Sequence, residues 1–113
     1  MNNNKLLVLN IELKDDKESI KQYVDYHSDV WPEVIKDLKD GSIASMRIYI
    51  IDNKLTMLLE VPKEFRLEDG IHTEPPSKVV GEWSRIMANL AKNVGGKPDT
   101  WKETKLIFDT EDY

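Results

Sequence analysis

The chain has 113 residues, a formal net charge of −5, two histidines and no cysteine. This length supplies one domain with a hydrophobic core, so we expect residues 1–113 to form a single domain. The acidic balance argues against nucleic acid or an anionic membrane as a partner. The lack of cysteine excludes a disulfide framework and a Cys-based metal site. No apolar run approaches the roughly 20 residues of a membrane helix, and the first residues lack a signal-peptide core, so a cytoplasmic protein is expected.

The first part of the chain predicts a strand followed by two helices. Residues 6–13 alternate between apolar and polar side chains in their second half, which favours a strand. Asp15 or Asp16 then caps a helix. A second, shorter helix begins at Pro32 and stops near Gly41. The first helix carries an apolar face at spacings i, i+3, i+4 and i+7, made of Ile20, Tyr23, Val24 and His27.

The second part predicts a hairpin, a loop, a long helix and a last strand. Strands over residues 43–51 and 54–61 flank Asp52-Asn53, whose residues tolerate a positive φ. Residues 62–76 are polar and predict a long loop. An apolar stripe predicts a helix over 77–94, ended by Gly95-Gly96, and a strand is expected at 103–109 through Leu106, Ile107 and Phe108.

The order β-α-β-β-α-β favours an α+β, ferredoxin-like fold, with one four-stranded antiparallel sheet and the helices on one face. That arrangement leaves the other sheet face bare. The strand at 43–51 is apolar on both faces, with Ile48 and Ile50 on one and Tyr49 and Ile51 on the other. A second copy is the simplest cover, which predicts a homodimer through the sheet face, of the dimeric αβ-barrel type. The alternative is that the 62–76 loop and the C-terminal tail cover this face.

The aromatic residues gather in one stretch around a histidine. The spacing Tyr23-x-x-x-His27-x-x-x-Trp31-Pro32-Glu33, together with Ile48-Tyr49 and Trp83-x-x-x-Met87, resembles the L-rhamnose mutarotase family. The resemblance implies a ferredoxin-like domain that dimerises through its sheets. It also implies an enzyme that interconverts the α and β anomers of a free six-carbon sugar, with no cofactor and no metal.

The resemblance also implies which residues form the site. The general acid of the family matches His27, and a substrate-binding tyrosine one turn earlier matches Tyr23. The first of two adjacent substrate-binding tryptophans matches Trp83, and Ser84 stands in place of the second. A substrate-binding tyrosine on the second strand falls on Met46. The substrate-binding candidates are therefore Tyr23, Met46, Trp83 and Ser84, with Tyr49 added as a further candidate on the same strand.

Histidine suits the chemistry that the resemblance implies. Opening a hemiacetal ring needs a proton removed from the anomeric hydroxyl and one delivered to the ring oxygen. The ordinary histidine pKa of about 6.5 allows both near neutral pH. Trp83 would stack on the sugar, and Tyr23, Tyr49 or a carboxylate could supply the second proton-transfer group. The competing interpretation for His27 is a core ring that donates to a backbone carbonyl.

Three functions remain open from the sequence. The first is a mutarotase for L-rhamnose or a related 6-deoxy sugar such as L-fucose. The second is a non-catalytic small-ligand or regulatory dimer on the same fold. The third is a haem-handling or oxygenase domain of the dimeric αβ-barrel kind. His72 is expected to be solvated. Trp31 is expected to be a core anchor, and Trp101 is expected to pack near the C-terminal strand. No ligand spacing supports a metal site.

Overall fold

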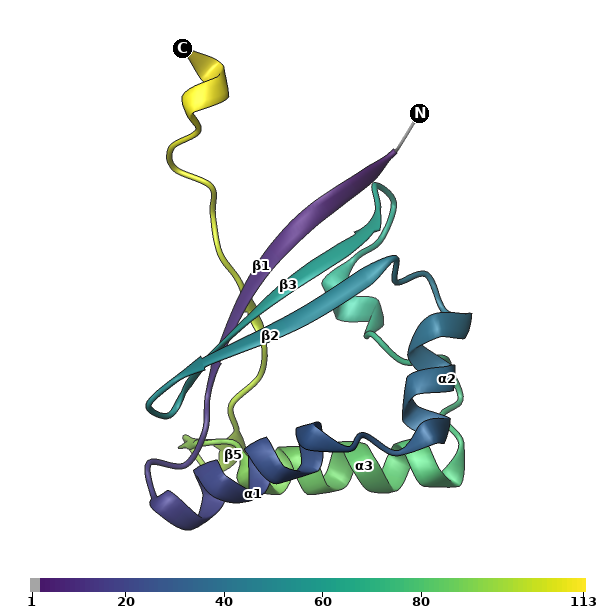
Figure 1. Cartoon of the computed structure of the whole chain (residues 1–113), viewed down its shortest axis with the longest axis vertical. Helices are drawn as coiled ribbons and strands as arrows, with labels where there is room; N and C mark the ends of the chain where they lie inside the picture. The colour runs from purple at the N-terminus through teal and green to yellow at the C-terminus, as the bar shows by residue number, and fades with distance from the viewer. Residues whose placement is uncertain (1–2) are drawn as a thin grey trace.

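In a computed structural model, which describes residues 3–113, the chain folds as a mixed α+β domain (Figure 1). Strands β1 (Asn4–Glu12), β2 (Ser45–Ile51), β3 (Lys54–Pro62) and the short β6 (Lys102–Glu103) form an antiparallel sheet in the order β2-β3-β1-β6. Helices α1 (Lys17–Ser28), α2 (Pro32–Asp40) and α3 (Lys78–Leu90) lie on one side of this sheet. The predicted positions of the first three strands and of α1 and α2 are confirmed within a few residues.

The sheet owes its two different faces to strand alternation. Successive side chains of a strand point to opposite sides, so every second residue of β1 and β3 faces the helices. These inward residues are the main core of the chain, and each is 9% exposed or less: Leu7, Leu9, Ile11, Leu55, Met57, Leu59 and Val61. At the tip of the β2–β3 hairpin, Asp52 takes the positive φ expected of the turn, 53°. The buried Asn53 side chain there donates to the carbonyl of Leu13.

The two helices before β2 begin where the sequence indicated. Asp16 caps α1, because its carboxylate accepts a hydrogen bond from the backbone N–H of Ser19 at 2.7 Å. Pro32 occupies the first turn of α2, where its missing N–H costs nothing. Between them the chain turns, so that α1 and α2 both pack against α3 (Figure 1). This joint places the end of α1, with His27, over the sheet.

Helix α3 is shorter than the sequence predicted. The helix begins close to the predicted position, with Ser77 as its cap, but it ends at Leu90 instead of continuing to Val94. Tertiary pairing ends it, because Ala91 forms a β-bridge with Leu13 and the backbone N–H of Lys92 donates to Glu12. Val94 instead lies in the small hairpin of β4 (Asn93–Val94) and β5 (Lys97–Pro98), where Gly95 and Gly96 adopt positive φ.

The loop at 62–76 has a mostly polar sequence, but some of its apolar side chains pack against the core. It contains a short 3₁₀ helix, η1 (Leu67–Asp69), and three of its apolar residues pack on the core cluster of β1 and β3. These residues are Phe65, Leu67 and Ile71. The loop therefore covers the inner face of the sheet, and the proposal that it covers the outer face is wrong.

The expected last strand at 103–109 is wrong beyond its first residues. Only β6 pairs with β1, and the last contact is Thr104, whose backbone N–H and hydroxyl both donate to the carbonyl of Val8. The chain then leaves the sheet as an arm that ends in a 3₁₀ helix, η2 (Thr110–Asp112) (Figure 1). Three consecutive apolar residues in a strand place apolar side chains on both faces of the sheet. The helices of a single chain cover only one of these faces. The arm side chains Leu106, Ile107 and Phe108 are consequently exposed.

No helix within residues 3–113 is long and apolar enough to cross a membrane.

Candidate active site

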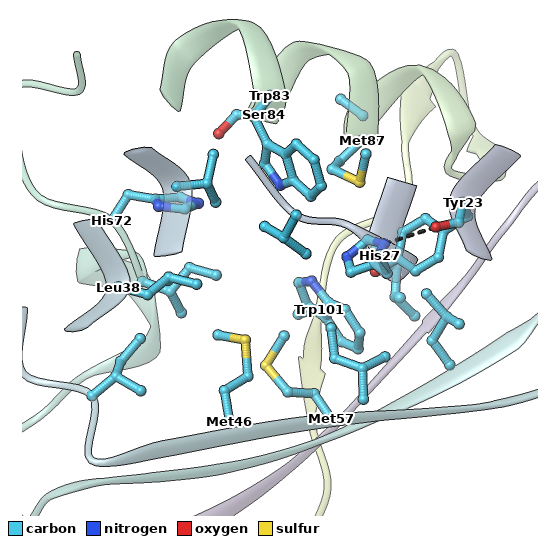
Figure 2. Close-up of a pocket in the computed structure, with 18 of the residues that line it drawn as sticks. Tyr23, His27, Leu38, Met46, Met57, His72, Trp83, Ser84, Met87 and Trp101 are labelled. Atoms are coloured by element: carbon cyan, nitrogen blue, oxygen red, sulfur yellow. Dashed lines mark hydrogen bonds between the residues drawn. The ribbon is translucent and has the colours of Figure 1, made fainter. Parts of the chain in front are cut away.

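A cavity of about 650 Å³ lies between the inner face of the sheet and the three helices. This volume falls in the range of small-molecule sites, about 300–1,000 Å³. Figure 2 shows its walls: Trp83 and Met87 from α3 on one side, and Met46 and Met57 from the sheet on the other. Most of its lining is apolar, so the few polar side chains in it decide how a ligand would be held.

His27 points into this cavity from the last turn of α1 (Figure 2). Its Nδ1 lies 2.8 Å from the backbone carbonyl of Tyr23. Because a carbonyl only accepts hydrogen bonds, Nδ1 must carry the proton, and Nε2 of the neutral ring keeps its lone pair. Nε2 makes no hydrogen bond with residues 3–113. The predicted core interpretation, a ring donating to a backbone carbonyl, is thus correct for one nitrogen and leaves the other for chemistry.

Burial sets the charge of this ring. It lowers the pKa of His27 below its ordinary value, and the hydrogen bond to Tyr23 opposes the shift without cancelling it. His27 is therefore neutral at neutral pH. A neutral imidazole with a free Nε2 is a proton acceptor, which is the form a general base needs.

An aromatic cluster fixes the orientation of His27. The ring of Tyr23 stacks on it with centroids 4.2 Å apart, and Trp83 meets it edge-on at 5.3 Å. Trp83 also contacts Tyr26 and Trp31 edge-on, and it is only 5% exposed. Trp31 is therefore a packing residue, as predicted, and it helps to hold the wall formed by Trp83.

Tyr23 has a neutral hydroxyl. Its side chain is buried, and this burial raises the pKa of the phenol well above its ordinary value. The phenol stays protonated through the neutral range, so it can donate and accept hydrogen bonds but is a weak acid. Its ring forms part of the cavity wall beside His27 (Figure 2).

The structure brings together five of the six site residues that the sequence predicted. His27, Tyr23, Met46, Trp83 and Ser84 all line the cavity. Tyr49 does not: it lies on the outer face of β2, on the opposite side from Met46, and is 53% exposed. The two positions are three apart along the strand, and an odd difference in position puts side chains on opposite faces. Tyr49 is therefore removed from the candidates for the second proton-transfer group.

The sequence analysis missed several cavity residues, among them His72 and Trp101. His72 is not solvated as expected, because its side chain is only 18% exposed and lines the cavity (Figure 2). Trp101 packs on both core clusters of the sheet, as predicted, but its ring also reaches the cavity. Both residues follow irregular segments, where no periodic pattern gives the direction of a side chain. A histidine amid polar loop residues was the only signal for His72.

One carboxylate side chain, that of Asp99, lines the cavity. Burial pushes the pKa of Asp99 upward, but hydrogen bonds from Lys102 and from the backbone N–H of Glu12 outweigh it and hold the pKa below its usual value. Asp99 is thus ionised and already paired. Among residues 3–113, no group of three or more His, Cys, Asp or Glu side chains comes together in a way that could hold a metal ion.

Comparison with known proteins gives consistent matches. A family model described as L-rhamnose mutarotase matches residues 7–110. An L-fucose mutarotase of Xanthomonas campestris is 28% identical over 102 residues, covering 87% of this chain and 82% of that protein. A UPF0734 protein of Dictyostelium discoideum is 28% identical over 108 residues, covering 89% and 86%. The crystal structure of an L-rhamnose mutarotase from Formosa agariphila has the same fold, with a TM-score of 0.66 at 19% identity over 94% of this chain and 98% of that one.

These matches first define a class. The fold and the family model make the chain a sugar mutarotase, which is an isomerase acting on carbohydrates. The family model matches residues 7–110, which is nearly the whole chain, and the chain therefore belongs to the L-rhamnose mutarotase family.

Proposed function

We propose that the chain interconverts the α and β anomers of L-rhamnose or a closely related 6-deoxy sugar, with His27 as the group that moves the proton. The observation that carries this proposal is the state of His27. Its Nδ1 is held by a carbonyl, burial keeps it neutral, and its Nε2 is left for a ligand in a cavity of about 650 Å³.

The proton path follows from that geometry. Nε2 of His27 removes the proton from the anomeric hydroxyl as the bond between C1 and the ring oxygen breaks. The bonding electrons pass to the ring oxygen, which takes the proton back from the imidazolium. The open-chain aldehyde rotates about C1–C2, and the reverse steps close the ring on the other face. Positioned acid–base groups of this kind typically contribute about 10²–10⁴-fold to the rate.

The walls of the cavity favour a 6-deoxy sugar. A 6-deoxy hexose carries a methyl group where other hexoses carry a hydroxymethyl group, and an apolar wall accepts only the former without leaving a hydroxyl unpaired. Met46, Met57 and Met87 supply flexible apolar surface. The indole ring of Trp83 supplies a flat aromatic surface against which the apolar side of a sugar can pack. We propose that Tyr23 and Ser84, which also line the cavity, hydrogen-bond sugar hydroxyls.

The experiment is saturation-transfer NMR between the α and β anomeric protons of L-rhamnose, L-fucose and D-glucose. Enzyme at micromolar concentration should transfer saturation well above the buffer rate for a 6-deoxy sugar. His27→Ala should lose about 10²–10⁴-fold of this acceleration while keeping the wild-type melting temperature. A lack of acceleration for every sugar tested would favour the non-catalytic ligand-binding alternative. An unfolded His27→Ala would instead make His27 a structural residue.

We further propose that two copies pair through the outer face of the sheet, on a ferredoxin-like fold in the cytoplasm. The strand order β2-β3-β1-β6 supports the fold assignment. Apolar side chains exposed on the outer face and the arm support the pairing, because monomers rarely expose large apolar patches. Those on the face include Tyr49 and Ile51, and those on the arm are Leu106, Ile107 and Phe108. A second copy can cover both sets at once.

A further inference from the structure

A second histidine, His72, forms a pair with Asp37 at the end of the cavity away from His27. His72 Nδ1 lies 2.7 Å from Asp37 Oδ2, although one residue comes from the 62–76 loop and the other from α2. Their side chains are only 18% and 10% exposed. Figure 2 shows the two histidines on opposite sides of the cavity, with Trp83 between them.

The hydrogen bonds of Asp37 decide which nitrogen of His72 is protonated. Burial pushes the pKa of Asp37 upward, but hydrogen bonds from Thr73 and His72 outweigh it and hold the pKa below its ordinary value. The carboxylate is thus ionised and can only accept, so His72 Nδ1 carries a proton. In the neutral ring, Nε2 then keeps its lone pair and can accept a hydrogen bond. Nε2 makes no hydrogen bond within residues 3–113. Every fully buried side-chain nitrogen or oxygen of these residues does make one, so Nε2 is not among the fully buried atoms. Nε2 is therefore accessible.

The pair does more than attach the loop to α2. The hydroxyl and the backbone N–H of Thr73 already donate to the other oxygen of Asp37, and these two bonds suffice as an attachment. The imidazole adds an acceptor that lines the cavity. An aspartate that fixes the tautomer of a histidine is a common way to aim the second ring nitrogen at a ligand.

A bound sugar needs such an acceptor. With C1 at Nε2 of His27, a pyranose presents the hydroxyls of C3 and C4 toward the far end of the cavity. The walls between the two histidines include Leu38 and Met46, which offer a hydroxyl little to bond, and Trp83, whose indole N–H can donate but not accept (Figure 2). A hydroxyl buried there without a partner would cost binding free energy.

We propose that His72 is the specificity-determining residue of this site, accepting a hydrogen bond at Nε2 from the C3 or C4 hydroxyl of the sugar, with Asp37 as its positioning residue. This proposal rests on the mutarotase function proposed above. A contact with the C4 hydroxyl gives a physical basis for choosing between 6-deoxy sugars. L-rhamnose and L-fucose differ in the orientation of the C2 and C4 hydroxyls, and an acceptor at a fixed place near C4 suits only one of the two C4 orientations.

The test compares His72→Leu with wild type on L-rhamnose, L-fucose and the 3-deoxy and 4-deoxy forms of the better sugar. His72→Leu should raise KM for the better sugar about 10- to 100-fold with kcat nearly unchanged, the pattern of a lost binding contact. For wild type, the KM of one of the two deoxy sugars should be as high as the KM of the parent sugar for His72→Leu. For that deoxy sugar, His72→Leu should raise KM no further. This non-additivity is what a direct contact requires.

Two further variants separate recognition from attachment of the loop. Asp37→Asn keeps the shape of the side chain, but its amide nitrogen donates to His72 Nδ1 and moves the proton to Nε2. It should therefore raise KM as His72→Leu does. Thr73→Val is the matched control, because it removes a bond to Asp37 without touching His72 and should leave KM within about twofold.

The ¹⁵N signals of the His72 imidazole in the wild-type chain report the contact whether or not the sugar turns over. They should show a proton on Nδ1 and shift on addition of the better sugar. An unchanged KM in His72→Leu, equal losses for the parent and both deoxy sugars, or unmoved ¹⁵N signals at saturating sugar would each overturn the proposal. Wild-type anomer exchange, measured in the same experiments, tests the mutarotase function separately.

Discussion

The two faces of the sheet carry similar side chains in different surroundings. On the inner face, the alternate residues of β3 (Leu55, Met57, Leu59 and Val61) are at most 1% exposed. On the outer face, Ile51 is 70% exposed, and Ile107 of the arm is 90% exposed. Hydrophobicity alone therefore does not tell which face is the core. The helices decide it, because they close over the inner face and leave the cavity between.

This difference also divides the roles of the two faces. The inner face needs a solid core beside a cavity, so a gap in its packing weakens the fold and reshapes the site. Among the described residues, the cavity of about 650 Å³ and both of its histidines, His27 and His72, belong to the inner side of the sheet. The apolar side chains of the outer face are suited to contact with another protein surface, which in the proposed dimer is a second copy.

The largest expected effect comes from breaking the inner face. Leu59→Ala should lower the free energy of unfolding by about 2–5 kcal/mol, because it leaves a hole in a close-packed core. Leu6→Ala, an equal truncation on the exposed side of β1, should cost about 0.5 kcal/mol or less. Urea unfolding at a protein concentration too low for association measures both. Equal losses would mean that the outer face is buried even in the single chain.

A smaller effect is expected from charging the outer face. Ile51→Glu should raise the dissociation constant of the proposed dimer at least tenfold, about 1.4 kcal/mol, because it buries an unpaired carboxylate. Val24→Glu is the matched control, since Val24 is a half-exposed apolar residue on α1 at the helical side of the molecule. Sedimentation equilibrium measures both. Association that survives Ile51→Glu would place the interface elsewhere.

The smallest effect is a pH dependence on the cavity side. Burial holds the pKa of His27 below the value of about 6.5 that it has in the unfolded chain. As the pH falls below about 6.5, the unfolded chain therefore binds a proton that the folded chain does not. The free energy of unfolding then declines until the pH reaches the folded pKa. In His27→Gln this part of the decline should be missing.

Urea unfolding of both proteins between pH 5 and 8 measures the difference. The kcat/KM of the wild type should hold through most of this window and decline only as the pH falls through the folded pKa at its acidic end, because only there does the folded ring become protonated and cease to be a base. Parallel stability curves for wild type and His27→Gln would mean that His27 titrates alike in both states.

The sequence by itself determined the local elements and the centre of the site. Strand alternation located β1, β2 and β3, and the capping candidates Asp15 and Asp16 together with Pro32 located the starts of α1 and α2. The spacing around His27 placed it with Tyr23 on one helix face, and in the structure the two rings stack. Alternation even separated Met46 from Tyr49, although both were proposed for one site.

Only the tertiary structure decided what lies far apart along the chain or follows no period. The 62–76 loop has no repeating pattern, so its folding onto the inner face and the pairing of His72 with Asp37, 35 residues away, could not be predicted. The early end of α3 depends on a bridge between Ala91 and Leu13. The arm at Leu106 to Phe108 has an apolar sequence typical of a strand. A strand needs a neighbouring strand to pair with, and within residues 3–113 the pairing with β1 ends at Thr104. Local periodicity sets the direction of side chains within an element, whereas the meeting of elements is set by the packing of the whole chain.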